Sequence, residues 1–270
     1  MEPSSFPILH DLHCHSFLSA CCGEEACTAP AIFALAKAMG YDTLCLTDHM
    51  WDPAVPGASD WYAPQTPEHV LSARRYANEA GLRCLVGCET EFTGDRLGLA
   101  PEHFDLFDFV VIPPNHMHFI GFVRPAGVIG AKEMAALFTD RLDRISRLDI
   151  PMEKTGIAHL TCRLLYSEGT VAEVIRRMDE KRLTEIFRRF ADRGAGIELN
   201  AAAFRELDDH PDETLLLYRV AKDCGCRFYC ASDAHRLASY RRVGEVLPRV
   251  TAALGLTAKD RYVIPKSPRE

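Results

Sequence analysis

Hydrophobic and polar residues follow one another along the chain in a repeated unit: a helix-period stretch, a glycine, a short apolar run and a polar tip. Apolar residues spaced three and four positions apart predict helices. A glycine directly after such a stretch marks its end, because glycine adopts the left-handed conformation of a helix C-terminus most easily. The helices predicted in this way cover residues 31–39, 67–80, 180–193 and 212–224, and they end at Gly40, Gly81, Gly194 and Gly225.

Short apolar runs predict the strands, which cover residues 8–13, 43–46, 84–86, 107–112, 155–159, 196–200 and 228–230. Helical patterns separate most of these runs, so we expect parallel βα units. The run Phe109-Val110-Val111-Ile112 is apolar throughout, which is typical of strands buried on both faces of a parallel sheet. Seven or eight such units favour an α/β fold with a closed, TIM-like barrel, formed as one domain by residues 1–270. A doubly wound open sheet is the alternative, but its glycine-rich loop is missing after the first strand.

Two connections stand out by their composition. Residues 51–67 hold both tryptophans and several prolines, and residues 115–130 are rich in aromatic residues and glycine. Loops that follow the strands of a barrel build its active-site face. Each segment is therefore either a lid over that face or an ordered insertion that covers the barrel rim.

Composition narrows the class of protein. The chain has 31 basic and 38 acidic residues and a formal net charge of −7, without long runs of like charge, which disfavours nucleic acid as a partner. No apolar run approaches the ~18 residues of a membrane span, and the N-terminal residues do not resemble a secretory signal. The eleven scattered cysteines are typical of small buried side chains in a reducing compartment. We therefore expect a cytoplasmic protein, and the oligomeric state stays open.

Histidines and carboxylates concentrate at the strand ends. Seven of the eleven histidines lie at or just past the ends of five predicted strands: His13, His15, His49, His116, His118, His159 and His235. The carboxylates at these tips are Asp48, Glu89, Glu91 and Asp233. In a parallel barrel all of these tips meet at one mouth. Imidazole and carboxylate ligands suit divalent transition metals, and a carboxylate between two ions can bridge them.

These tips together resemble a known family. The motifs, in chain order, are Asp11-Leu12-His13-Cys14-His15-Ser16, Leu46-Thr47-Asp48-His49, Gly87-Cys88-Glu89, His159 and Ser232-Asp233-Ala234-His235. In that order they are similar to the PHP (polymerase and histidinol phosphatase) superfamily, over about residues 8–250. The stretches closest to its histidinol-phosphatase branch are Ala158-His159-Leu160, Glu198-Leu199-Asn200 and Ser232-Asp233-Ala234-His235-Arg236.

The resemblance implies a distorted (β/α)7 barrel that holds two or three divalent ions, either Zn, Mn or Fe. The implied ligands are His13, His15, Glu89 and Asp233 for one ion, Glu89, His116 and His159 for a second, and His49 and His235 for a third. Cys21 stands where the family often has a further histidine, so it is an additional candidate for the third ion. His118 is the alternative to His116, which is favoured because it lies nearer the strand end.

The implied reaction is hydrolysis of a small phosphomonoester, such as histidinol phosphate, by a hydroxide that bridges two ions. Asp48 and His49 are the candidate catalytic residues. Asp48 either orients a ligand imidazole, which we favour, or protonates the leaving alkoxide, and Asp11 is a further orienting candidate. We expect Arg163 to bind the phosphate. Its rivals are Arg124, Arg205 and Arg236.

Three other functions remain open. A nucleotide or oligonucleotide phosphate is the second substrate choice, because tryptophans in residues 51–67 can stack on a base. Metal-dependent amide hydrolysis usually needs a carboxylated lysine or fewer carboxylates. No lysine lies at a strand tip except Lys154, which precedes the strand over residues 155–159. A non-catalytic, metal-binding module of the same family is the alternative outside enzymology.

Overall fold

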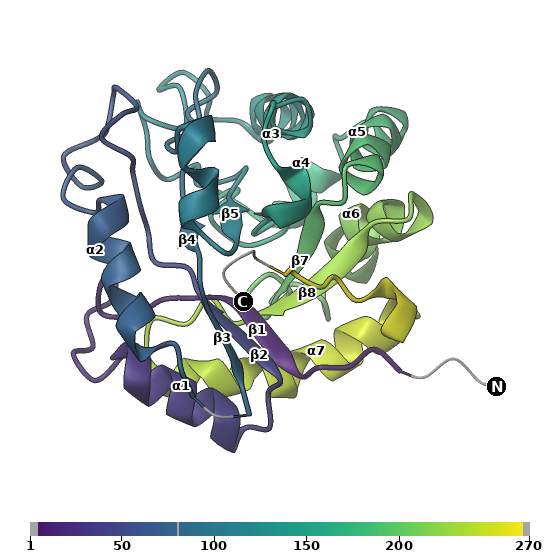
Figure 1. The fold of residues 1–270 in the computed structure, drawn as a ribbon. Helices are drawn as coiled ribbons and strands as arrows, with labels where there is room; N and C mark the ends of the chain where they lie inside the picture. Colours follow the sequence, from purple (N-terminus) through teal and green to yellow (C-terminus); the bar gives the residue numbers. More distant parts are fainter. Residues whose placement is uncertain (1–4, 80, 267–270) are drawn as a thin grey trace.

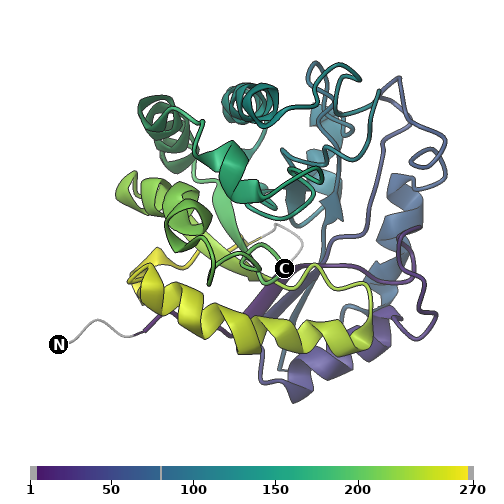
Figure 2. The same ribbon diagram turned by 180° about the vertical axis from the view of Figure 1, so that it is seen from behind.

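The protein forms a ring of parallel strands surrounded by helices (Figures 1 and 2). The structure is a computed structural model, and it describes residues 5–79 and 81–266. Its strands are β1 (His10–Cys14), β2 (Thr43–Leu46), β3 (Arg83–Val86), β4 (Cys88–Glu89), β5 (Val110–Ile112), β6 (Thr155–Ile157), β7 (Gly196–Asn200) and β8 (Arg227–Ala231).

The strands pair in the order β1-β2-β3 and β4-β5-β6-β7-β8, and all pairs are parallel. β3 and β4 are consecutive pieces of one strand, divided at Gly87. A Cβ atom at Gly87 would lie 2.2 Å from the carbonyl oxygen of Phe109, so only glycine allows this close approach to the chain leading into β5. The ring closes where the N–H of Asp233, after β8, donates to the carbonyl oxygen of His13 at 2.8 Å. This closure distinguishes the fold from an open sheet, and the predicted TIM-like (β/α)7 barrel is confirmed.

Helices cover the outside of the ring. The α-helices are α1 (Ala29–Ala38), α2 (Pro67–Leu71), α3 (Ala131–Ser146), α4 (Val171–Ile175), α5 (Glu180–Asp192), α6 (Pro211–Asp223) and α7 (Arg242–Ala253). Short 3-10 helices are η1 (Ser72–Tyr76), η2 (Pro101–Leu106), η3 (Met152–Lys154), η4 (Leu237–Arg241) and η5 (Ala258–Asp260). The apolar faces of the longer helices pack on the strands, which buries the main core between the two layers.

A second, smaller core fills the inside of the ring. Its residues from the strands and their ends are Leu12, Cys45, Leu85, Phe109, Val111, Ala158, Tyr229 and Ala231. Tyr262 and Ile264 join them from the C-terminal segment, where the N–H of Tyr262 donates to the carbonyl oxygen of Phe228 at 2.7 Å. Because Phe228 lies at the start of β8, this segment closes the N-terminal end of the ring. A functional site is therefore expected at the opposite end of the ring, where the C-terminal ends of the strands lie.

The strand predictions are confirmed in order, with ends that shift by up to three residues. The glycines predicted to end helices all have positive φ values, at 75° for Gly40, 85° for Gly81, 77° for Gly194 and 84° for Gly225. Three of the predicted helices, residues 31–39, 180–193 and 212–224, are confirmed as α1, α5 and α6.

The helix predicted over residues 67–80 is wrong in its second half. The α-helical part ends at Leu71, and η1 continues it to Tyr76. The hydroxyl of Ser72 donates to the carbonyl oxygen of His69 at 2.6 Å, a local bond that competes with the α-helical pattern. Ala80, the last residue of that prediction, lies outside the described residues. The sequence pattern also missed α3 and α7.

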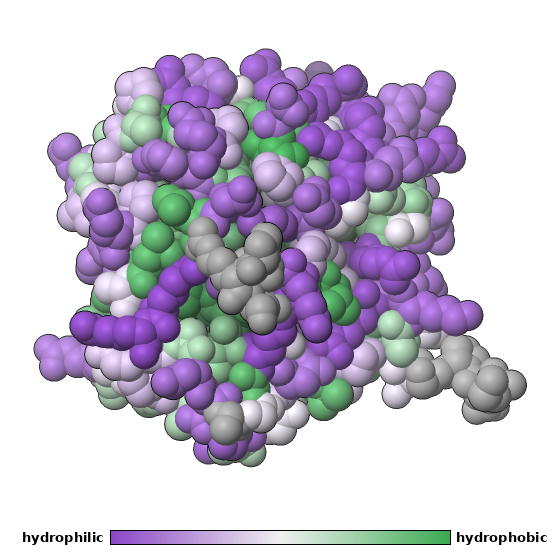
Figure 3. All heavy atoms as spheres, viewed as in Figure 1, coloured by the Kyte–Doolittle hydropathy of each residue, from purple (hydrophilic) through white to green (hydrophobic). Residues whose placement is uncertain are grey.

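The surface is mainly hydrophilic on the face shown in Figure 3, where hydrophobic side chains form small, separate groups. Among the helices of the described residues, none combines the length and the apolar character that a membrane crossing needs.

Candidate metal centre

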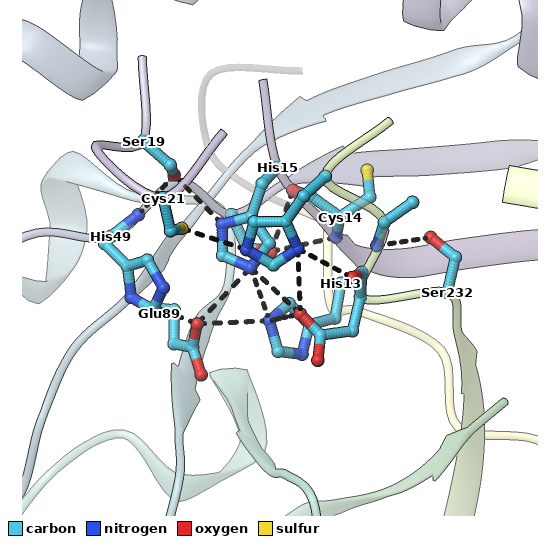
Figure 4. Close-up of polar contacts among 12 residues, drawn as sticks. His13, Cys14, His15, Ser19, Cys21, His49, Glu89 and Ser232 are labelled. Atoms are coloured by element: carbon cyan, nitrogen blue, oxygen red, sulfur yellow. Dashed lines mark hydrogen bonds and ion pairs between the residues drawn. The ribbon is translucent and has the colours of Figure 1, made fainter. Parts of the chain in front are cut away.

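Four side chains from three parts of the ring converge at the C-terminal ends of the strands. Three of them, His13, His15 and Glu89, are labelled in Figure 4. His13 belongs to β1, His15 follows it, Glu89 ends β4 and Asp233 follows β8. The Nε2 atoms of His13 and His15 lie 3.1 Å apart, and they lie 3.3 and 3.4 Å from Oε2 of Glu89. Oδ1 of Asp233 lies 3.3 Å from Nε2 of His15. The two imidazoles and two carboxylates therefore face one point.

The other oxygen of Glu89 faces a second group. Oε1 of Glu89 lies 3.6 Å from Nε2 of His116 and 3.8 Å from Nε2 of His159. Nε2 of His159 also lies 3.2 Å from Oδ2 of Asp233. Each of these two carboxylates, Glu89 and Asp233, directs one oxygen to the first group and its other oxygen to the second group. Carboxylates that bridge two ions have this arrangement.

A third group of donors lies on the outer side of His15. Nδ1 of His49 is 3.2 Å from Oε2 of Glu89, and Nε2 of His235 is 2.9 Å from Sγ of Cys21. The potential ligand atoms of His15, Cys21, His49 and His235 all lie within 4.8 Å of one another. All eight ligand positions expected from the sequence, together with Cys21, thus meet in one region.

The donor set fits divalent metal ions. Both carboxylate oxygens of Glu89 and both ring nitrogens of His159 are buried and make no hydrogen bond. Leaving such groups without a partner costs free energy, and a cation between them would remove that cost. Several imidazoles together with carboxylates form the ligand set that zinc, manganese and iron accept.

Electrostatic coupling in the cluster is strong. Burial raises the pKa of Glu89, but the imidazoles of His49 and His13 outweigh it and hold the pKa well below its usual range. Burial lowers the pKa of His159, but Asp233, Glu198 and Glu89 outweigh it and raise the pKa to about 9. The carboxylates therefore favour positive charge at His13, His15 and His159 until a metal replaces the proton, whereas burial lowers the pKa of His49 and of His235.

Two of these residues adopt a strained backbone. His159 has a φ of 57° and Asp233 a φ of 49°, and they are the only non-glycine residues with positive φ in the described parts of the chain. This left-handed conformation costs roughly 1–2 kcal/mol per residue. The N–H of His159 donates to Oε2 of Glu198 at 2.6 Å, and the N–H of Asp233 donates to His13. These hydrogen bonds offset the cost of the left-handed conformation. That conformation directs both side chains into the mouth of the ring.

Two buried carboxylates, which were not predicted from the sequence to have this role, support the histidines from behind. Nδ1 of His13 donates to Oε1 of Glu198 at 2.5 Å, and Nδ1 of His116 is bonded to Glu91. The hydroxyl of Tyr62 donates to the same oxygen of Glu91 at 2.8 Å. Such bonds fix which ring nitrogen faces the metal. A signal was present, because Glu91 lies two residues after Glu89 and Glu198 lies in a strand.

Asp48 lies behind His15 and does not line the cavity. Its carboxylate accepts hydrogen bonds from the N–H and the hydroxyl of Ser16 and from the hydroxyl of Ser19, each at 2.7 Å. Oγ of Ser19 lies 3.0 Å from Nδ1 of His15, so Ser19 links Asp48 to that imidazole. Asp11 accepts from the N–H groups of His13 and Ser232 and ties β1 to β8. These positions suit orienting roles better than proton donation to a substrate.

A cavity of about 370 Å³ opens above the cluster. Trp61 and Phe119 line one side of it, with ring centroids 5.7 Å apart, so the segments 51–67 and 115–130 meet over the mouth. His49 and His118 also line this cavity. His116, and not His118, lies against Glu89.

A second cavity of about 170 Å³ shares Leu164 and Asp233 with the first. Arg163 and Arg205 line it, and within the described chain neither has an ion-pair partner. The other two arginines considered above differ: Arg124 pairs with Glu168 at 3.1 Å, and Arg236 lines neither cavity.

Lys154 lies away from both cavities. It precedes β6, at the end of the ring opposite the cluster, and its Nζ lies 3.3 Å from Oδ1 of Asp105. Among the described residues no lysine lines either cavity, so the carboxylated lysine that metal-dependent amide hydrolysis usually needs is not found there.

Comparisons with known proteins bear on the family and on the fold. A family model described as "PHP domain" matches residues 11–202. Among solved structures, a histidinol phosphate phosphatase from Lactococcus lactis subsp. lactis Il1403, complexed with zinc, L-histidinol and phosphate, aligns with a TM-score of 0.55. The two are 17% identical, and the alignment covers 95% of this chain and 98% of that one, which supports the fold.

A dihydropteroate synthase from Coxiella burnetii aligns at 11% identity over 93% of this chain and 94% of that one. Its TM-score of 0.39 is too low to support an inference. The search of curated proteins found no match.

Proposed function

The chain belongs to the PHP domain family, and on that premise we propose that it is a metal-dependent phosphoesterase that hydrolyses a small phosphomonoester. One observation carries the proposal. Glu89 is buried among five histidines, and its two oxygens face different groups of imidazoles. A carboxylate placed in this way holds two cations close enough to act on one phosphoryl group.

The residues that would hold the ions follow from the three groups. They are His13, His15, Glu89 and Asp233 for one ion, Glu89, His116 and His159 for a second, and His49 and His235 for a third. When bound, such ions neutralise phosphoryl oxygens and lower the pKa of a bound water to about 7. The ligand types suit Zn, Mn and Fe alike.

The remaining residues bind and orient. Arg163 and Arg205 line a cavity that Asp233 also lines, which supports a role for them in binding the phosphate. Guanidinium groups bind phosphate oxygens in pairs and keep their charge at any working pH. Asp48, Glu91 and Glu198 hold His15, His116 and His13 in the orientation that binding needs.

Histidinol phosphate is the leading substrate. The cavity volume of about 370 Å³ suits a small molecule. The phosphatase of similar fold that was solved with zinc, L-histidinol and phosphate supports this substrate and this metal. A nucleotide phosphate is the second candidate, because Trp61 and Phe119 form an aromatic wall on which a base can stack.

A phosphatase screen tests the proposal. Metal-free protein is loaded with Zn²⁺, Mn²⁺ or Fe²⁺ and assayed with histidinol phosphate, simple alkyl phosphates, nucleotides and a short oligonucleotide. We expect release of phosphate from small monoesters and its loss in His13→Ala and Asp233→Ala. Activity that survives both substitutions would overturn the site. A loaded protein that hydrolyses none of these esters would instead indicate a non-catalytic metal-binding module.

A further inference from the structure

An exposed thiol lies at the edge of the metal cluster. All eleven cysteines belong to the described residues, and Cys21 is the only one that is exposed. Its Sγ lies 2.9 Å from Nε2 of His235, and both residues line the cavity of about 370 Å³ together with His49. Figure 4 shows Cys21 on the same side of the cluster as His49. A sulfur donor therefore stands next to two imidazoles.

The hydrogen bonds of His235 direct its free nitrogen at this thiol. Nδ1 of His235 lies 2.9 Å from the carbonyl oxygen of Asp233, which can only accept, so the ring proton is at Nδ1. The lone pair of Nε2 then points to Sγ of Cys21. His15 completes the cluster, but its Nε2 is already directed at Glu89 and Asp233. Cys21 and His235 are in direct contact, and His49 completes the group with a ligand atom within 4.8 Å of theirs, although its Nδ1 also lies 3.2 Å from Oε2 of Glu89.

The loop that carries Cys21 is held on both sides. The N–H of Ala20 donates to the side-chain oxygen of Gln65 at 2.9 Å, and Sγ of Cys22 donates to the carbonyl oxygen of His235 at 3.2 Å. Neighbouring residues thus fix the loop to the segment 51–67 and to the end of β8. The thiol is placed by these contacts and is not a freely moving surface group.

We propose that Cys21 ligates, as a thiolate, the divalent ion held by His49 and His235, and that this ligand makes the position selective for Zn²⁺ over Mn²⁺. One sulfur and two nitrogen ligands leave a fourth tetrahedral position open, as zinc sites that bind a water or a substrate do. Thiolate selects zinc, whereas the carboxylate-rich groups around Glu89 also suit manganese. The thiol proton passes to solvent when the ion binds.

Cobalt substitution tests the ligand without any assay of activity. Metal-free protein is titrated with Co²⁺, and we expect a sulfur-to-cobalt charge-transfer band in the near ultraviolet. Cys21→Ser should abolish the band and bind about one zinc ion fewer per chain at saturation. Cys84→Ser, at a half-buried cysteine in β3, is the matched control and should keep both.

The substitution Cys21→His distinguishes two effects: loss of the thiolate ligand and loss of the whole metal site. Cys21→His should bind zinc in the wild-type amount, without the band, and should bind manganese better than wild type does. An unchanged band in Cys21→Ser, or cobalt bound to wild type without any band, would overturn the proposal. Neither result would touch the groups around Glu89, so the proposed reaction would still stand on its own test.

Discussion

Nδ1 of His13 lies 2.5 Å from Oε1 of Glu198, although 185 positions separate the two residues in the chain. The second oxygen of Glu198 accepts the N–H of His159 at 2.6 Å. One buried carboxylate therefore orients two histidines that come from opposite sides of the ring. A carboxylate behind a ligand imidazole fixes its tautomer and raises its basicity.

Replacing Glu198 with glutamine should weaken metal binding about 10- to 100-fold, because the amide keeps the shape but loses the charge. The measurement is a competition titration with a metal-binding dye. Glu185→Gln, at an exposed position on α5, serves as the control and should bind metal as wild type does. Equal affinities in the two variants would show that Glu198 has no positioning role.

Metal affinity should rise with pH up to at least about pH 9, the pKa of His159. Burial lowers the pKa of His13, but Glu89 and Glu198 outweigh it and raise the pKa well above its usual range, and the pKa of His159 is about 9. Both imidazoles are then protonated at pH 7 in the metal-free protein, and a cation must displace those protons. Calorimetric titrations in buffers with different ionisation enthalpies count the released protons. Affinity that stays constant between pH 6 and about pH 9 would contradict this account.

His10 should make the fold sensitive to acid. Its Nε2 accepts the N–H of Cys230 at 2.9 Å, and burial, together with the charge of Arg261, lowers its pKa to about 3. The unfolded chain takes up this proton near pH 6.5, so between about pH 6.5 and about pH 3 the unfolded state binds more protons and stability falls as the pH falls.

The variant His10→Gln should therefore lose stability less steeply, by up to about 1.4 kcal/mol per pH unit in that window. Urea unfolding at several pH values, with a chelator present to exclude effects of metal release, measures the difference. The same slope in both proteins would remove His10 as the cause.

Arg163→Ala and Arg205→Ala should each reduce kcat/KM for a phosphomonoester about 10- to 150-fold. This is the effect of losing a charged hydrogen bond worth about 1.5–3 kcal/mol. Steady-state kinetics with the best substrate of the screen measure it. Arg188→Ala, at an exposed position on α5, should keep the wild-type value. If all three variants behave alike, the smaller cavity does not bind phosphate.

Trp61→Ala should separate the two candidate substrates. Stacking of a base on an aromatic ring contributes about 1–3 kcal/mol, so KM for a nucleotide should rise roughly 5- to 150-fold if a base lies against Trp61. KM for an alkyl phosphate should change little, because no base is present. Parallel changes for both substrates would mean that Trp61 supports the cavity without contacting a base.

Local patterns in the sequence predicted much of the fold because they depend on neighbouring residues. A glycine after a helical stretch ends the helix through its own backbone freedom, as Gly40 and Gly194 show. The division of a strand at Gly87 was not predictable, since it arises from contact with Phe109. The early end of α2 depends on a single bond from Ser72 to His69, which competes with a valid helical pattern.

For the candidate site, the sequence by itself determined which kinds of side chain follow the strands, because period and turn signals are local. The tertiary structure alone decided which of His116 and His118 lies against Glu89. It also placed Glu198 against His13, and it placed Arg205 in the same cavity as Arg163. It also brought Cys21 to His235, 214 positions away. Such pairings depend on how β8 closes against β1, and closure of a ring is a property of all its strands together.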